Sequence, residues 1–483
     1  MVDATALRAA FARRLSAMYG AEVPAYNTMV EVAQEVNREV LARMGAGAER
    51  LGSIGRVTAE RHGAIRVGTP AELAQVARIF GAMGMYPVGY YDLREAASSS
   101  VPVVSTAFRP VDEAELAANP FRVFTSMLVT GDRRFFGADL ERRLGEFLGA
   151  RRLFPPRLLE LADRAEAEGG LDEEAAEEFL TLATGAFELS AEPVSRGWYA
   201  ELERVSAVAA DIGGVTSTHV NHLTPRVLDI DALYARMSER GITMIDAIQG
   251  PPRWDGPDLL LRQTSFRALA EPRMFREDDG RVVQDDLRVR FGEVEARGIA
   301  VTPAGRALYD ALSAELSDTL SAGLSAGLDG VPAAQRVTAE ERNAAGAKLW
   351  ADRVPRTEAE LVAGDLAYFT FHVLDARPGA VPPADLATLL ADGWVGARPI
   401  VYEDFLPRSA AGIFQSNLTS DGAKDVTAAG ADFGADALAG VLGRPLHDPY
   451  ELYASIRAAS LARVRDELGL PQEIAPPAAP SPG

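Results

Sequence analysis

Two stretches of the chain, His62-Gly-Ala-Ile-Arg66-Val67 and His222-Leu-Thr-Pro-Arg226-Val227, can be laid over each other. In each stretch a histidine opens a strand-like run, an arginine follows four positions later, and a valine comes next. The helix predicted after each stretch contains a leucine at the same offset, Leu73 in the first copy and Leu233 in the second. Further strand-like sequence follows both helices. This shared order favours a duplicated βαβββ unit.

The first copy has a well-defined helix start in Thr69-Pro-Ala-Glu72, which is a capping box with proline at the first helical position. Apolar side chains then recur at helical spacing until Gly84, where the helix is predicted to end. Strand-like runs follow at 86–91 and 101–108. The first module is therefore predicted at about residues 50–112.

The second copy has the same order of elements. A strand-like run over 215–227 leads into a helix that begins near Ile230, with Asp229 as its cap, and ends at Gly241. We predict an α+β fold in which this module, at about 212–300, pairs with the first to form a cupped sheet. Its three further strand candidates lie at 242–248, 259–269 and 289–299.

The rest of the chain is predicted to decorate these modules within a single domain over residues 1–466. The predicted parts are helices over 1–48, a charged helical insertion over about 113–208, a mainly helical C-terminal part over about 302–466 with strand-like runs at 366–373 and 395–405, and a disordered Pro/Ala-rich tail over 467–483.

The composition is that of a globular protein, with 47% hydrophobic and 24% charged residues among 483. A net charge of −20 disfavours nucleic acid and anionic membranes as partners. Because cysteine is absent, disulfides, thiolate metal ligands and cysteine nucleophiles are excluded. The sequence has neither a signal-peptide pattern nor an apolar run of membrane-spanning length. We expect a soluble cytoplasmic protein, with no obligate protein partner.

The duplicated unit resembles the vicinal oxygen chelate superfamily, in which two βαβββ modules form a cupped sheet around a metal ion. That superfamily takes its metal ligands from the first and last strands of modules. The resemblance implies that His62 and His222, which open first strands, and Glu293, in the last strand of the second module, hold the ion. Two histidines and one carboxylate form the facial triad of non-haem Fe(II) oxygenases, so Fe(2+) is the expected cofactor.

The carboxylate ligand is open between two residues. Glu293 and Glu295 share one face of their predicted strand, so alternation cannot separate them. We favour Glu293 because it is nearer mid-strand, whereas Glu295 stands beside Arg297 at the strand end, where a solvated ion pair is the ordinary interpretation. His372 and His447 are interpreted as structural residues. His219 is interpreted either as structural or as a residue that contacts the metal ligands without binding the metal.

Five phrases carry a closer resemblance: His62-Gly-Ala-Ile-Arg66, Asn221-His-Leu-Thr-Pro-Arg226, Arg262-Gln-Thr-Ser-Phe266, Phe291-Gly-Glu-Val-Glu295 and Arg398-Pro-Ile-Val-Tyr-Glu-Asp404. Together they resemble the family of 2-oxoadipate dioxygenase/decarboxylases, also called 2-hydroxyglutarate synthases, over about residues 20–465. The resemblance implies an Fe(II)-dependent dioxygenase that converts 2-oxoadipate and O2 into 2-hydroxyglutarate and CO2. Its substrate would chelate the iron through its 2-oxo acid end, so no separate co-substrate is required.

The resemblance also implies substrate contacts from Arg66 and from the backbone of Val401. Arg66 lies four residues from His62 on the same strand face, roughly 13 Å along the strand. A metal-bound dicarboxylic acid could span part of that distance, and the arginine could pair with its distal carboxylate. Gln263 and Ser265 alternate on one strand face and are possible pocket-lining residues.

Two other functions fit the same fold. One is a different metal-dependent reaction, an isomerisation or a ring cleavage, and a fourth protein ligand to the metal would favour an isomerase. The other is a metal-free small-molecule binding protein, which metal analysis of anaerobically purified protein would distinguish.

Overall fold

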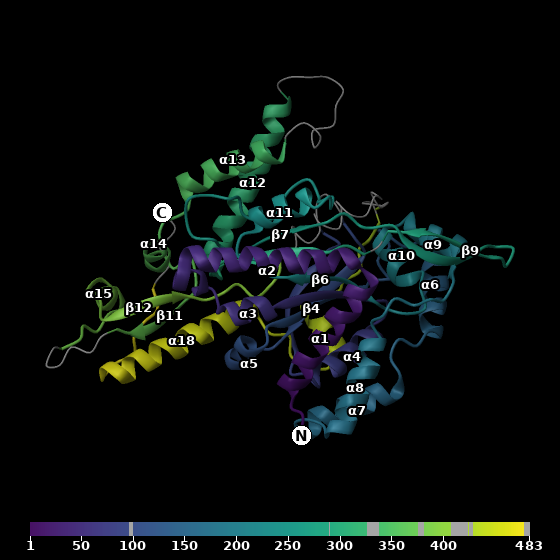
Figure 1. Ribbon diagram of the computed structural model, residues 1–483, viewed down its shortest axis with the longest axis horizontal. Coiled ribbons are helices and arrows are strands. Elements are labelled where there is room, and N and C mark those ends of the chain that lie inside the picture. The colour runs from purple at the N-terminus through teal and green to yellow at the C-terminus, as the bar shows by residue number, and fades with distance from the viewer. Residues whose placement is uncertain are drawn as a thin grey trace.

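A computed structural model describes residues 1–95, 100–288, 290–325, 338–374, 381–406, 424 and 428–477. Helices and strands are mixed along the chain, as an α+β fold requires. A five-stranded sheet in the order β2-β3-β4-β1-β6 lies at the centre, and the pair β10-β7 extends it beyond β6 (Figure 1). The predicted α+β class is therefore confirmed.

The first module has the predicted βαβββ order: β1 (Arg61–Val67), α4 (Pro70–Gly81), β2 (Tyr86–Asp92), β3 (Val103–Arg109) and β4 (Phe121–Leu128). The helix α4 begins with the predicted capping box, in which Thr69 and Glu72 each accept a hydrogen bond from the other's backbone N–H. The last strand, β4, returns to lie beside β1 and runs parallel to it.

The first module ends later than predicted. The strand β4 lies inside the region 113–208 that we predicted as a helical insertion, and it pairs with both β1 and β3. All eight residues of β4 are buried, so its sequence lacks the alternation that marks a strand with one solvated face. The helical insertion itself starts at α6, after the module is complete.

The second module repeats this arrangement with β6 (Val220–Pro225), α11 (Ile230–Glu239), β7 (Leu261–Ser265) and β10 (Glu293–Arg297). The strand β6 is antiparallel to β1 and joins the modules. A parallel bridge between Arg226 and Glu295 places β10 beside β6, as β4 lies beside β1. The same parallel first-to-last pairing in both modules supports duplication. Asp229 caps α11 as predicted.

The strand predicted at 242–248 forms only isolated backbone bridges with β7 and the residue after it: Met244 bridges Phe266 and Gln249 bridges Gln263. Residues 242–249 therefore run beside β7 without forming a continuous strand. Residue 289, where the last predicted strand was expected to begin, lies outside the described residues.

The two faces of the central sheet pack into different cores. Ile65 belongs to a large core under α1 (Ala4–Glu22), α2 (Pro24–Met44) and α4. Its neighbour Ala64 belongs to a second core with Phe124 and side chains of the helical insertion, because successive strand residues point to opposite faces. The second face also carries the candidate site.

The insertion consists of α6 (Ala138–Ala150), α7 (Pro156–Glu168), α8 (Glu173–Gly185), β5 (Val194–Ser195), α9 (Arg196–Glu203) and α10 (Ala207–Gly213). An unpredicted hairpin of β8 (Glu271–Arg276) and β9 (Val282–Leu287) pairs with β5 and projects at one end of the molecule (Figure 1). Three short helices complete the modules: η1 (Gly45–Glu49), α3 (Ile54–Ala59) and α5 (Glu113–Ala118).

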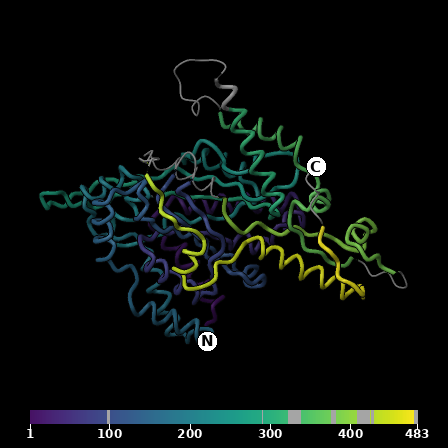
Figure 2. The backbone as a smooth tube through the Cα atoms, turned by 180° about the vertical axis from the view of Figure 1, so that it is seen from behind, coloured from purple at the N-terminus to yellow at the C-terminus, as the bar shows by residue number. Residues whose placement is uncertain are grey.

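The C-terminal part shares a third core with Leu259–Leu261 of the second module, whereas Leu438 and Leu442 pack into the large first core. Its elements are α12 (Pro303–Ser325), α13 (Ala339–Arg353), α14 (Glu358–Ala363), β11 (Phe369–Val373), α15 (Leu386–Ala391), β12 (Val395–Pro399), α17 (Ala435–Leu442) and α18 (Pro449–Leu468). Seen from behind, the yellow-green part of the chain that precedes α18 runs across the molecule toward that helix (Figure 2).

The chain remains packed beyond the predicted end of the domain at residue 466. Ile474, in the region predicted as a disordered tail, is buried in the C-terminal core, because an isolated apolar side chain can find a partner despite its Pro/Ala-rich surroundings. Residues 478–483 of the predicted tail lie outside the described residues. None of the described helices combines the length and the apolar character needed to cross a membrane.

Candidate metal centre

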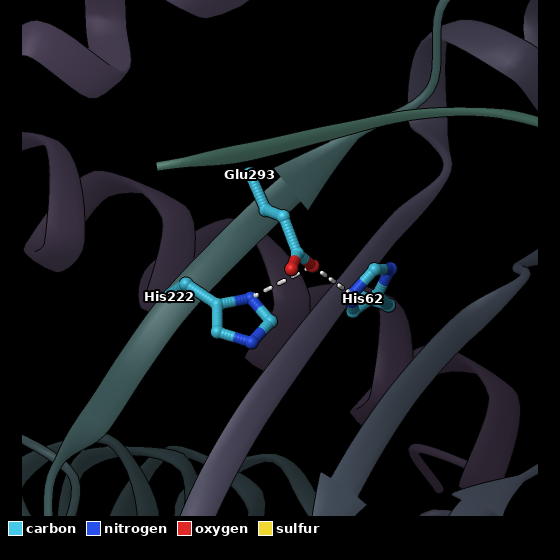
Figure 3. Close-up of side chains that lie close together, drawn as sticks. All are labelled: His62, His222 and Glu293. Carbon is cyan, nitrogen blue, oxygen red and sulfur yellow. Dashed lines mark hydrogen bonds and ion pairs between the residues drawn. The ribbon is translucent and has the colours of Figure 1, made fainter. Parts of the chain in front are cut away.

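Three side chains predicted as metal ligands meet on one face of the joined modules (Figure 3). His62 comes from β1, His222 from β6 and Glu293 from the start of β10, and all three are buried. One ligand atom from each residue lies within 4.8 Å of the other two. Nε2 of His62 and Nδ1 of His222 lie 3.1 Å and 3.5 Å from Oε2 of Glu293.

Strand register brings these residues together. His62 stands opposite Thr224 in the β1–β6 pair, and Ala64 stands opposite His222. The two histidines therefore occupy consecutive rows of the same face, and their rings meet edge to face at 5.4 Å. Glu293 reaches this face from β10, on the far side of β6.

The spacing of the donor atoms fits a divalent metal ion. Bonds of about 2.1 Å from one ion to two ligands at a right angle place the ligand atoms about 3.0 Å apart. The two nitrogen-to-carboxylate distances, 3.1 Å and 3.5 Å, are close to this value. Two imidazoles and one carboxylate are the donor set of the facial triad. The residues present therefore fit a bound cation such as Fe(II).

The charges of the cluster also favour a cation. Burial raises the pKa of Glu293, but His222 and His62 together lower it below its usual value, so the carboxylate is ionised. Burial lowers the pKa of His222 to about 4, which leaves its imidazole neutral and able to coordinate. Burial also lowers the pKa of His62, but the carboxylates of Glu295 and Glu293 raise it by more, so the pKa of His62 lies above its usual value.

Glu295 differs from the prediction in position and environment: it is the middle residue of β10 and Glu293 is the first, so the expectation that Glu293 is nearer mid-strand was wrong. Glu295 does form an ion pair with Arg297, at 2.6 Å and 2.9 Å, but the pair is buried rather than solvated. Its Oε2 lies 3.0 Å from Nδ1 of His62, on the side of the ring away from Glu293. Sequence alternation placed Glu295 on the correct face, but it carried no signal for this contact across three strands.

Neighbouring side chains hold the three predicted ligands in place. Thr224 donates a hydrogen bond to Oε2 of Glu293 at 3.2 Å, and its hydroxyl also lies 3.2 Å from Nδ1 of His222. The ring of Phe291 stacks on His222, and the ring of Phe405 packs edge to face against His62. These contacts fix both imidazoles in a water-poor environment.

Arg66 lies on the same face of β1 as His62, two rows further along. Its guanidinium forms an ion pair with Asp211 at the end of α10, and both residues are buried. Asp211 is held in turn by Asn221, which donates to it at 2.9 Å, and by His219 at 3.3 Å. The row of Arg66 across the sheet also contains Ser126, its partner on β4.

The possible lining residues are also next to the cluster. Ser265 stands opposite Glu293 and Gln263 opposite Glu295 in the β7–β10 pair, and both are buried. Val401 belongs to the segment after β12 (Val395–Pro399). It bridges Ile299, beyond the end of β10, and borders a cavity of about 860 Å³ whose described lining includes Arg109 and Arg398 but none of the three clustered residues. The substrate contact of Val401 therefore stays a prediction from the resemblance.

The other histidines and Arg226 lie outside the cluster. His219 is buried beside Asp211, and burial lowers its pKa to about 4. His372 is exposed on β11, and His447 bridges Val88 through its backbone. Arg226, the repeat mate of Arg66, pairs with Glu60 at 3.0 Å and donates to the carbonyl of Leu51, so it supports the fold.

Comparisons with known proteins agree on one family. A family model described as 2-oxoadipate dioxygenase/decarboxylase matches residues 11–417. A curated 2-oxoadipate dioxygenase/decarboxylase of Mycobacterium tuberculosis is 57% identical over 455 residues, covering 93% of this chain and 96% of the relative. One of Pseudomonas putida is 41% identical over 477 residues, covering 97% and 98%. The crystal structure of the hydroxyglutarate synthase of Pseudomonas putida in complex with 2-oxoadipate is similar with a TM-score of 0.82 and 39% identity, covering 97% of this chain and 99% of that chain.

Proposed function

The chain belongs to the 2-oxoadipate dioxygenase/decarboxylase family, and from this premise we propose that it converts 2-oxoadipate and O2 into 2-hydroxyglutarate and CO2 on Fe(II) held by His62, His222 and Glu293. The six carbons of the substrate are recovered as a five-carbon hydroxy acid and CO2. Both atoms of O2 enter the products, so no external reductant is needed. The activity is that of a decarboxylating dioxygenase.

The His-His-Glu cluster carries this proposal. Fe(II) in such a triad supplies redox chemistry with O2 and keeps positions open for the carboxylate and keto oxygens of a 2-oxo acid. In the part of the chain that the structure describes, the cluster has three members. A triad suits an oxygenase better than the isomerase alternative, which a fourth ligand would favour.

Arg66 is proposed to bind the distal carboxylate of the substrate. It is four residues from His62 on one strand face, roughly 13 Å along β1, which a six-carbon diacid and a flexible arginine can span together. A guanidinium can hold a carboxylate through two parallel hydrogen bonds. Because Asp211 already pairs with Arg66, the distal carboxylate would share the guanidinium with it.

The apolar side chains around the cluster are proposed to exclude water during turnover. Phe405 and Phe124 pack against each other at 5.0 Å, and Phe405 also contacts His62. The ring of Phe291 stacks on His222. In such a dry environment the interaction between Arg66 and a carboxylate is stronger than in water.

Oxygen uptake with a series of 2-oxo acids tests the proposal. Protein purified without oxygen and loaded with Fe(II) should consume one O2 per 2-oxoadipate and release one CO2. With 18O2, the 2-hydroxyglutarate should gain two labelled oxygen atoms, since both oxygens stay on the five-carbon fragment. Metal-free protein is the control. Uptake that needs an added second 2-oxo acid, or a product with one labelled atom, would overturn the intramolecular reaction.

A further inference from the structure

A carboxylate outside the cluster, that of Glu295, contacts His62. Nε2 of His62 faces Glu293 at 3.1 Å, while Nδ1 lies 3.0 Å from Oε2 of Glu295. The N–H direction of Nδ1 does not point along the line to this oxygen, so the contact is an ion-pair distance rather than an aligned hydrogen bond. A hydrogen bond here requires the ring of His62 to turn from its orientation in the structure.

Glu295 is itself held rigidly. Arg297 grips both of its carboxylate oxygens, and Nη1 of Arg122 lies 3.7 Å from Oε1. Arg297 also donates to the backbone carbonyls of Tyr402 and Asp404, which fixes its own position. The Glu295 carboxylate is thus anchored in a buried network and is not free to follow His62.

The same network contains a second glutamate that does not contact His62. Glu60 is fully buried and lies 2.8 Å from Arg122, 3.3 Å from Arg297 and 3.0 Å from Arg226. Glu60 and Glu295 therefore balance the same two arginines, Arg122 and Arg297. Of these two glutamates, only Glu295 also contacts a proposed metal ligand. Comparing variants of Glu60 and Glu295 therefore distinguishes an effect on the fold from an effect on metal binding.

We propose that Glu295 is a positioning residue: it receives the Nδ1–H of His62 and directs Nε2 at the metal. This inference rests on the proposed function, because it requires His62 to be a ligand. Metal-bound histidines usually donate their second ring N–H to a carboxylate, a carbonyl or water, and this fixes the ring and strengthens the ligand. The ring of Phe405 packs edge to face against the same imidazole and covers it.

The test compares Glu295→Gln with Glu60→Gln. Each variant removes one negative charge from the same arginine pair and keeps the side-chain volume. Fe(II) and Co(II) affinities are measured without oxygen by competition with a chelator, together with the thermal midpoint of the metal-free protein and the visible absorption of the Co(II) form. Both variants should be less stable without metal. Glu295→Gln alone should lose metal affinity, by about 10- to 100-fold, and change the Co(II) spectrum.

The outcomes are distinct. Wild-type affinity in Glu295→Gln, or an equal loss in Glu60→Gln, would overturn the positioning role and leave Glu295 as a member of the structural network. If Glu295→Gln does not fold, Glu295→Asp keeps the charge but withdraws the carboxylate from His62. It should then show weakened metal binding with stability closer to the wild type, and unchanged binding would overturn the role. Failure of the wild-type protein to bind Fe(II) would instead contradict the proposed function.

Discussion

The guanidinium of Arg66 is ion-paired with the carboxylate of Asp211, and both side chains are almost completely buried. Asp211 is kept in place by Asn221 and His219. Burial raises the pKa of Asp211, but His219 and Arg66 lower it below its usual value, so the carboxylate is charged. The proposed anchor for the substrate is therefore already oriented before any diacid binds.

Asp211→Asn should destabilise the protein and increase its stabilisation by a diacid. Removing one partner of a buried ion pair costs up to about 3–5 kcal/mol, and asparagine, which keeps a hydrogen bond, should cost about 3 kcal/mol or less. A distal carboxylate would replace the missing charge beside Arg66. Thermal unfolding of the metal-loaded protein without oxygen should show a larger upward shift with 2-oxoadipate in the variant than in the wild type. The monoacid 2-oxohexanoate should shift both equally, and equal shifts with 2-oxoadipate would contradict the shared-guanidinium arrangement.

His62→Ala, His222→Ala and Glu293→Ala should each abolish tight Fe(II) binding while the protein stays folded, because a triad has no spare ligand. A ligand that binds only the native state raises the unfolding temperature, so added Fe(II) should stabilise the wild type and none of these three variants. Metal content after anaerobic desalting measures the same property directly. His372→Ala, at an exposed histidine on β11, is the control and should retain metal. Retention of stoichiometric iron by any of the three would remove that residue from the ligand set.

Thr224→Val should weaken metal binding by about tenfold without unfolding the protein. The substitution keeps the shape of the side chain but removes the hydroxyl that donates to Glu293, and a hydrogen bond to a charged group contributes about 1.5–3 kcal/mol. Thr264→Val is the matched control, since Thr264 is equally buried on β7 and its hydroxyl contacts none of the ligands. Chelator competition on both variants measures the effect. A similar loss of affinity in both would show that threonine packing, rather than the hydroxyl of Thr224, matters.

The sequence predicted the parts of this protein that depend on local pattern. The capping box at Thr69 and the cap at Asp229 mark helix starts through backbone chemistry, and both are present. The equivalent positions of His62 and His222 in the repeat could also be recognised from this one sequence. They follow from a duplicated strand, which places the same offset on the same face.

Other features could not be predicted because they depend on contacts between distant strands. The strand β4 is buried on both faces and lacks the alternation of a half-solvated strand. It was therefore predicted as part of the helical region that follows it. The contact of Glu295 with His62 joins residues from two modules, and no local pattern encodes it. The role of Val401 was predicted only from the resemblance of the motif at 398–404. That motif does not indicate that Val401 pairs with Ile299.

Arg66→Ala should reduce the preference for a diacid over a monoacid. If Arg66 binds the distal carboxylate, 2-oxoadipate should be turned over well by the wild type, and 2-oxohexanoate, which lacks that carboxylate, poorly. Losing a charge-assisted pair in a buried site costs about 1.5–3 kcal/mol, or about ten- to a hundredfold in kcat/KM. Arg66→Ala should therefore impair the diacid strongly and the monoacid little. Arg66→Lys should restore only part of the activity, because an ammonium cannot reproduce the planar two-point contact.

The decisive quantity is the ratio of kcat/KM for the two acids, measured in the wild type and in both Arg66 variants at equal metal occupancy. The ratio removes any loss that both substrates share, such as damage to the proposed metal ligand His62, four residues away on β1. Asp211 remains in Arg66→Ala as a buried carboxylate without this arginine, and its repulsion of a second carboxylate should lower the ratio further. The double variant with Asp211→Asn should recover part of that additional loss. If Arg66→Ala depresses both acids by the same factor, Arg66 supports the strand or the metal site, and the diacid preference must arise elsewhere.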